Sequence, residues 1–119
     1  LPFMRRQEWG RIINMSSIVG EVGIPGTVAY STSKSGLFGL TKTLAAENAK
    51  KHITVNVLAL GYFDIGMISV IKPDIQEKIK ENIPMGRFGD PRNIELAIRF
   101  LIESDYITGT VLNMNGGLY

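Results

Sequence analysis

Residues 53–60 read ITVNVLAL and are followed by Gly61. The segment is rich in β-branched residues and carries no charge, so it predicts a strand that is buried on both faces. Such strands are typical of parallel sheets, in which helices cover both sides. Residues 12–15 (IINM) and 110–114 (TVLNM) predict two further strands of similar character.

The segment between the first two strands predicts a long helix. No proline occurs from residue 29 to about residue 51, and Leu40 and Leu44 belong to a series of apolar residues at helical spacing. We expect one broad apolar face on this helix. Gly36 and Gly39 weaken it by roughly 1 kcal/mol each relative to alanine, so we expect another part of the structure to pack close to the backbone there.

The segment before the last strand predicts two shorter helices. In residues 73–83 isoleucines recur every four positions, and Pro84 ends the pattern. Asp90 can cap the free amides of a further helix, and Pro91 suits its first position. Strands and helices therefore alternate along the chain, which predicts a parallel sheet with helices on its faces.

The composition excludes several classes of protein. The 119 residues carry a net charge of +2, which is too even a balance to indicate a nucleic-acid partner. There is no cysteine and the only histidine is His52, so we expect neither disulfides nor a metal site. No apolar run is long enough to cross a bilayer, and no signal peptide is visible. We therefore expect a cytoplasmic protein without a membrane partner.

The first residues predict a chain that begins inside a domain. Leu1 is not a methionine, and residues 1–8 read like the last turns of a helix that is already under way. We therefore expect a piece of a longer protein. A true start at Met4 is the alternative interpretation.

Tyr30 and Lys34 are the first candidates for chemistry, because residues four apart on a helix lie on one face. A free tyrosine has a pKa of about 10 and is a poor acid at neutral pH. A neighbouring cation favours the phenolate, so such a pair can exchange a proton with an alcohol or carbonyl oxygen. The alternative is a surface tyrosine that stacks on a lysine stem.

Ser17 adds a third candidate. It follows the first predicted strand, and open α/β sheets bind their ligands at the carboxyl ends of their strands. Its hydroxyl can bond the same substrate oxygen as the tyrosine. Ser16 competes for this role, because neighbouring residues of a strand face opposite sides and only one of the two can face the site. A serine that merely ends a strand is the alternative.

Four segments, in order, resemble those of short-chain dehydrogenases/reductases: residues 10–17 (GRIINMSS), 30–36 (YSTSKSG), 53–57 (ITVNV) and 107–117 (ITGTVLNMNGG). The resemblance covers nearly the whole chain. It implies that residues 1–119 are the C-terminal, catalytic half of one Rossmann-type α/β domain. This half of the doubly wound parallel sheet would hold three strands and about three helices, and the N-terminal, cofactor-binding half would be absent.

The resemblance also implies a role for each candidate. Ser17 would polarise a substrate carbonyl, Tyr30 would donate the proton as the hydride arrives, and Lys34 would stabilise the phenolate and bond the nicotinamide ribose. Residues from about 65 to 84 would form a lid, whose isoleucines either cover an acyl chain or only pack the helix. Besides Tyr30 and Lys34, the cofactor-binding residues would be Leu60, Gly61, Phe63 and Ile65.

Two positions depart from the family pattern. Leu60 stands where most members have proline, and Ile65 stands where many have a threonine that bonds the nicotinamide amide. Isoleucine cannot make that bond. Nothing in residues 1–10 supplies the glycine-rich turn that binds the pyrophosphate.

The resemblance is strongest to 3-oxoacyl-[acyl-carrier-protein] and acetoacetyl-CoA reductases. It implies an oxidoreductase of fatty acid biosynthesis that reduces a 3-oxoacyl thioester to the 3-hydroxyacyl form. NADP(H) is expected ahead of NAD(H), no metal is expected, and a homodimer or homotetramer is the expected assembly. Two alternatives stay open. The first alternative is a truncated, non-catalytic fragment that acts only through association. The second is a family member that acts on another secondary alcohol or ketone.

Overall fold

The computed structural model describes residues 1–119 as four α-helices, three short 3₁₀-helices and three strands. The strand predicted at residues 53–60 is confirmed with the same bounds, and so is the predicted alternation of strands and helices. In chain order the elements are α1 (Pro2–Gln7), β1 (Gly10–Ser17), η1 (Ile18–Gly20), α2 (Val28–Asn48), η2 (Ala49–Lys51), β2 (Ile53–Leu60), η3 (Gly66–Val70), α3 (Pro73–Asn82), α4 (Pro91–Glu103) and β3 (Val111–Met114).

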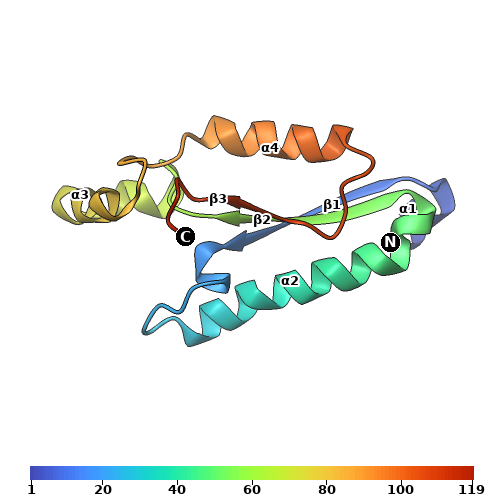
Figure 1. Ribbon diagram of the computed structural model, residues 1–119, viewed down its shortest axis with the longest axis horizontal. Coiled ribbons are helices and arrows are strands. Elements are labelled where there is room, and N and C mark those ends of the chain that lie inside the picture. Colours follow the sequence, from blue (N-terminus) through green and yellow to red (C-terminus); the bar gives the residue numbers. More distant parts are fainter.

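The three strands form one parallel sheet in the order β1-β2-β3. Ser17 pairs with Leu60, and Leu60 pairs with Met114, so the carboxyl ends of all three strands lie side by side. Helix α2 covers one face of the sheet and α4 covers the other (Figure 1). The predicted α/β class with helices on both faces is therefore confirmed.

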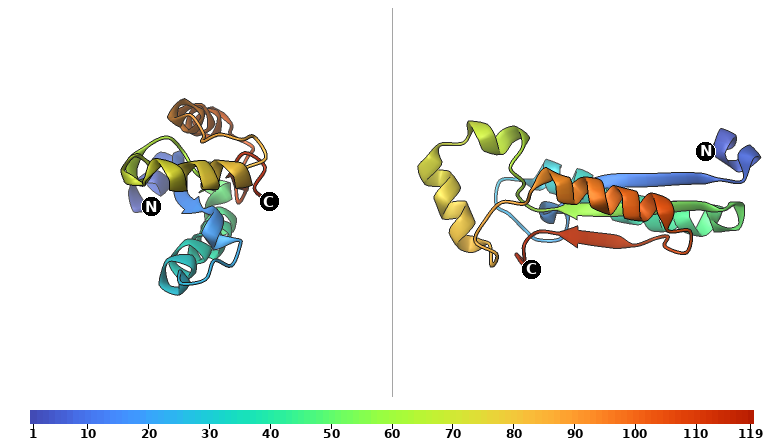
Figure 2. Two further views of the ribbon diagram at one scale, coloured as in Figure 1. Left: turned by 90° about the vertical axis from the view of Figure 1, so that its left-hand side faces the viewer. Right: turned by 90° about the horizontal axis from the view of Figure 1, so that it is seen from above.

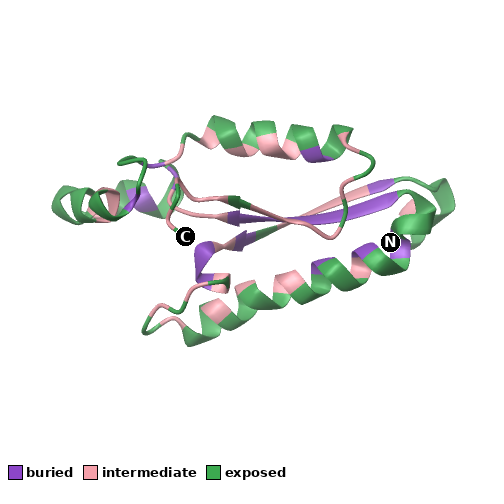
Figure 3. Ribbon diagram, in the orientation of Figure 1, coloured by how far each residue is buried: buried purple, intermediate pink, exposed green.

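The core is centred on β2. Seven of its eight residues are buried, and Figure 3 shows the buried part of the sheet concentrated on this strand. Ile53 and Val55 pack with Ala45 of α2 on one side of the sheet. A second cluster joins Ile83 and Phe88 beyond the end of the sheet. The lack of charge in β2 follows from this position, since both of its faces are covered.

The predicted broad apolar face of α2 is wrong in part. The residues that α2 buries are Thr41, Ala45 and Asn48, whereas Leu40 is 46% exposed. Small and polar side chains let the helix approach β1 closely. The Asn14 amide of β1 donates a hydrogen bond to the Thr41 hydroxyl of α2 at 2.9 Å. The buried side of α2 therefore depends on a hydrogen bond as well as on apolar contact.

The expectation of a close neighbour at two glycines of α2 is not met within this chain. A Cβ added to Gly36 or to Gly39 would meet no other atom within 4 Å. Both glycines are exposed. Packing inside this chain therefore does not require glycine at either position.

Loops and α3 extend beyond the sheet at the carboxyl ends of the strands, while α1 lies at the other end (Figure 2). The segment predicted as residues 73–83 forms α3 over Pro73–Asn82. The helix predicted at Asp90 forms α4, and the Asp90 carboxylate accepts a hydrogen bond from the Arg92 amide at 2.8 Å. No helix combines the length and the apolar character that a membrane span needs.

Candidate active site

The predicted catalytic residues all lie near the carboxyl end of β1. Ser17 is the last residue of β1, and Tyr30 and Lys34 belong to the first turns of α2. The connection between them folds back, so that α2 begins at the end of the sheet where β1 stops (Figure 1). The Lys34 ammonium donates a hydrogen bond to the Met15 carbonyl at 2.9 Å, which joins the start of α2 directly to the end of β1.

The structure distinguishes the two competing serines. Ser16 is only 4% exposed, and its hydroxyl donates to the Lys34 carbonyl at 2.9 Å. Ser17 is half-buried, and its hydroxyl accepts one long hydrogen bond, from the Val19 amide at 3.4 Å. Because Ser16 is already used between β1 and α2, Ser17 is the hydroxyl that is free to meet a ligand.

The Tyr30 and Lys34 side chains are neighbours. The Lys34 Nζ atom lies 5.7 Å from the centroid of the Tyr30 ring, and the tyrosine is 50% exposed. A cation at this distance from an aromatic ring is attracted to the face of the ring. The contact by itself also fits a tyrosine stacked on a lysine. The location of the pair favours a role in chemistry over simple stacking. The pair lies next to the end of β1, and open α/β sheets bind their ligands at the carboxyl ends of their strands.

The turn after Ser17 is held against α2. The Ser35 hydroxyl donates to the Gly20 carbonyl at 2.6 Å. A Cβ on Gly20 would lie 3.0 Å from the Phe38 ring and 3.1 Å from the Ser16 hydroxyl, so the turn and the helix approach each other closely. The turn that follows Ser17 is therefore attached to α2.

Leu60 and Gly61 lie next to Ser17, at the end of β2. The Gly61 amide donates to the Met114 carbonyl at 2.8 Å. A Cβ on Gly61 would lie 2.8 Å from the Asn115 Cα atom, so only glycine fits where the chain passes β3. The absence of a side chain at Gly61 therefore has a packing reason within the chain, and it also leaves the end of β2 flat.

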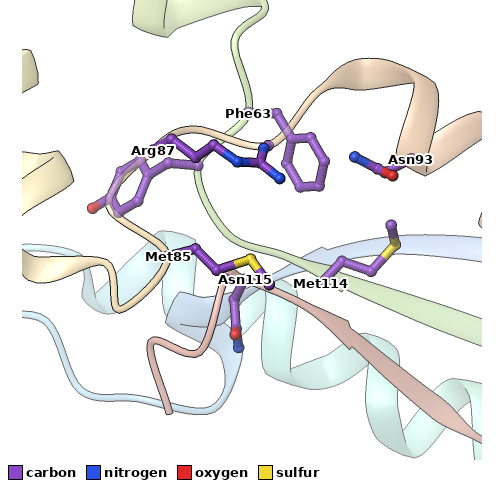
Figure 4. Close-up of a pocket in the computed structure, with 9 residues that line it drawn as sticks. Phe63, Met85, Arg87, Asn93, Met114 and Asn115 are labelled. Carbon is purple, nitrogen blue, oxygen red and sulfur yellow. The ribbon is translucent and has the colours of Figure 1, made fainter.

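Phe63 and Ile65 have different surroundings. Phe63 is buried, and its ring occupies the space that a Cβ on Gly89 would need. It lines a cavity of about 210 Å³ in which Arg87 and Asn93 point toward it (Figure 4). Ile65 is 60% exposed. The Phe63 ring is thus used in packing, while the Ile65 side chain is open to an apolar contact only.

The segment predicted as a lid contains isoleucines that pack onto the body of the chain. Ile83 is buried in the cluster with Phe88, so it packs the segment onto the body of the chain. Ile79 packs against the same cluster and also lines a second cavity of about 210 Å³ between α3, the turn after Ser17 and the residues after β3. The residues that line this cavity are Ile18, Val22, Ile24, Tyr62, Ile79, Asn82, Leu118 and Tyr119.

A polar cluster beside this cavity was missed from the sequence. The Asn113 amide donates to the Glu21 carboxylate at 3.4 Å. Burial, and then a hydrogen bond to Glu21, raise the pKa of Tyr119 to about 12. The Asn115 side chain lies near the phenol and offsets part of the increase in the pKa of Tyr119. The amide nitrogen of Asn115 is buried and has no hydrogen-bond partner. No local pattern could reveal the contact, because Glu21 and Tyr119 stand at opposite ends of the sequence.

No group of three or more histidine, aspartate or glutamate side chains has the arrangement that could hold a metal ion. The polar groups around Ser17, Tyr30 and Lys34 at the carboxyl end of the sheet include hydroxyls, amides and the Lys34 ammonium. Hydroxyl donors beside a cation can polarise a carbonyl and move a proton to its oxygen. The site is therefore suited to chemistry at a carbonyl or an alcohol.

Comparison with known proteins gives the family. A family model described as "Enoyl-(Acyl carrier protein) reductase" matches residues 1–119. A 3-oxoacyl-[acyl-carrier-protein] reductase FabG of Aquifex aeolicus is 46% identical over 118 residues, which are 98% of this chain and 48% of the relative. Nodulation protein G of Azospirillum brasilense is 45% identical over 119 residues, with 98% and 48% covered. Carbonyl reductase family member 4 of Xenopus laevis is 47% identical over 118 residues, with 99% and 49% covered.

The chain belongs to the short-chain dehydrogenase/reductase family, so the family predicted from the four sequence segments is confirmed. The chain spans about half the length of the curated relatives it matches. That share agrees with the predicted half of a Rossmann-type domain.

Proposed function

We propose that the protein containing this chain reduces a 3-oxoacyl thioester to the 3-hydroxyacyl form with a nicotinamide cofactor. The observation that carries the proposal is the arrangement of Ser17, Tyr30 and Lys34 at the carboxyl end of the sheet, with Ser16 turned away into the helix contact. The substrate class is supported by the Aquifex and Haemophilus influenzae relatives, both named as 3-oxoacyl-[acyl-carrier-protein] reductases.

In the proposed mechanism each side chain acts on one oxygen atom. The Ser17 hydroxyl donates a hydrogen bond to the substrate carbonyl and polarises it. The Tyr30 hydroxyl then donates its proton to the same oxygen, and the ammonium of Lys34 stabilises the phenolate that remains. The bound cofactor supplies the hydride.

The residues at the end of β2 fit a flat nicotinamide ring. Leu60 and Gly61 lie beside Ser17, and no Gly61 side chain projects there. Lys34 uses one of its three donors on the Met15 carbonyl, which leaves two N–H groups for ribose hydroxyls. Ile65 lies near by but offers only apolar contact. We propose NADP(H) as the cofactor, ahead of NAD(H).

The proposed assembly is a homodimer or homotetramer in the cytoplasm, with contacts through α2 and β3. On α2, Val28 and Leu40 are exposed, and the surface at Gly36 and Gly39 is open. A helix with small residues and exposed apolar side chains suits close packing against another helix. We further propose that residues 65–84 form the lid and that Ile79 contacts the acyl chain, because it lines the apolar cavity beside the turn after Ser17.

The decisive test replaces Tyr30 by phenylalanine in the natural protein that contains these 119 residues. Reduction of an acetoacetyl thioester is followed by the loss of NADPH absorbance. We expect Tyr30→Phe to lower kcat by about 100-fold or more, since a general acid contributes about 10² to 10⁴. Tyr106→Phe is the matched control, because Tyr106 is almost fully exposed and follows α4 at the far end of the sheet. Equal turnover in the two variants would refute the role of Tyr30.

A second measurement tests whether these 119 residues bind the cofactor by themselves, which a non-catalytic fragment would not do. The 119-residue chain alone is titrated with NADPH and NADH, and Trp9 and nucleotide fluorescence are followed. We expect no saturable binding, because residues 1–10 contain no glycine-rich phosphate loop. Saturable binding would show that these residues hold the cofactor unaided.

A further inference from the structure

The turn after β1 has the candidate catalytic serine at one end and a glutamate at the other. Ser17 is the residue before η1, and Glu21 is the residue after it. The Glu21 amide donates to the Ile18 carbonyl at 2.9 Å, which closes the turn. A movement of the Glu21 backbone would therefore be transmitted over one short turn to Ser17.

The Glu21 side chain reaches from this turn to the third strand. Its carboxylate accepts a hydrogen bond from the Asn113 amide of β3 at 3.4 Å. It also lies close enough to the Tyr119 phenol to contribute to the raised pKa of that group. These contacts join the turn to residues on the far side of β2.

The turn is thus held from two sides. Ser35 of α2 holds the Gly20 carbonyl from one side, and Glu21 is held by β3 and Tyr119 from the other. In the loop that follows, a Cβ on Gly23 or on Gly26 would meet no atom within 4 Å. Glu21 is therefore the residue through which the end of the turn forms a hydrogen bond with β3.

We propose that Glu21 is a positioning residue that holds the Ser17 hydroxyl in place by tethering the turn to Asn113 and Tyr119. The inference rests on the proposed function, since it assigns Glu21 an effect on the reaction through Ser17. Glu21 itself touches neither the substrate nor the cofactor in this scheme.

The test is a double-mutant cycle in the natural protein that contains this chain. We expect Glu21→Ala to lower kcat by about 10- to 100-fold through misplacement of Ser17, with the KM for the cofactor unchanged. In a Ser17→Ala background, Glu21→Ala should cause no further loss. Glu21→Gln keeps an acceptor oxygen and should retain kcat within about twofold. Glu103→Ala is the control, because this exposed carboxylate ends α4 far from the turn.

The outcomes separate the inference from the proposed function. If Ser17→Ala leaves kcat unchanged, the proposed function fails. If Ser17→Ala slows the reaction but Glu21→Ala does not, or if Glu21→Ala slows both backgrounds equally, the positioning role fails. Hydrogen exchange of the Val19 amide, which donates to Ser17, gives a readout without turnover. It should become faster in Glu21→Ala and stay unchanged in Glu103→Ala, and equal rates in the two variants would overturn the tether.

Discussion

Replacement of Gly61 by alanine tests the closest approach in the candidate site. The added Cβ would lie 2.8 Å from the Asn115 Cα atom and 2.9 Å from its Cβ atom, whereas carbon atoms pack best at about 3.5 to 4.0 Å. One of the contacting atoms belongs to the backbone, so a side-chain rotation cannot relieve the clash. The ends of β2 and β3 must therefore move apart by several tenths of an ångström or more.

The expected loss of stability has two parts. Overpacking of this kind costs about 1–3 kcal/mol. The Gly61 amide also donates to the Met114 carbonyl at 2.8 Å, and separation of the strands weakens this bond, which is worth about 1 kcal/mol. We expect Gly61→Ala to lower the free energy of unfolding by about 2–4 kcal/mol.

The measurement is urea unfolding of the natural protein that contains this chain, followed by circular dichroism, with the m-value checked for constancy. Gly23→Ala is the matched control, because a Cβ there would meet nothing within 4 Å and the residue has no positive φ. That variant should be stabilised by about 0.4–1 kcal/mol through the unfolded state. Equal stability of the Gly61→Ala variant and the unmodified protein would refute the packing explanation of Gly61.

Two further predictions concern the body of the sheet and the cluster beside it. Leu101 is 1% exposed, so Leu101→Ala should lower the free energy of unfolding by about 2–5 kcal/mol in a urea titration. Ile102→Ala is the control. Because Ile102 is half-exposed, this change should lower the free energy of unfolding far less. The folded-state pKa of Tyr119 is raised to about 12, above the value of about 10 in an unfolded chain, so its contribution is present below pH 10 and is lost between pH 10 and 12. Because Tyr119 is 45% exposed, solvent screening reduces this contribution to about 1 kcal/mol or less. Tyr119→Phe should have a flatter stability profile in that range, and identical profiles would contradict the raised pKa.

Much of the fold could be predicted because it depends on local patterns. The bounds of β2 follow from its β-branched, uncharged run, which ends at glycine. The start of α4 follows from Asp90 and Pro91, whose preference for these positions arises from one or two neighbouring amides. In such cases the residues that cause a boundary lie within a few positions of it.

The buried side of α2 could not be predicted in the same way. Periodicity of apolar residues favours Leu40, but the helix turns Thr41 and Asn48 inward, where polar groups of other elements meet them. Asn14 donates to Thr41, and the Arg5 side chain donates to Asn48 at 2.6 Å. A buried polar residue is tolerated only when a partner is available, and both partners come from distant parts of the sequence.

The Ser16 and Ser17 pair shows how one contact can determine several features of the site. Alternation along a strand leaves two candidates, and the choice depends on which side α2 covers. The bond from the Ser16 hydroxyl to the Lys34 carbonyl places α2 on the Ser16 side, and the bond from Lys34 to the Met15 carbonyl holds the ammonium at the same level. Ser17 is left on the opposite side of the strand, where its hydroxyl accepts only the long hydrogen bond from the Val19 amide. The freedom that makes Ser17 available to a ligand therefore also makes its position dependent on the tether at Glu21.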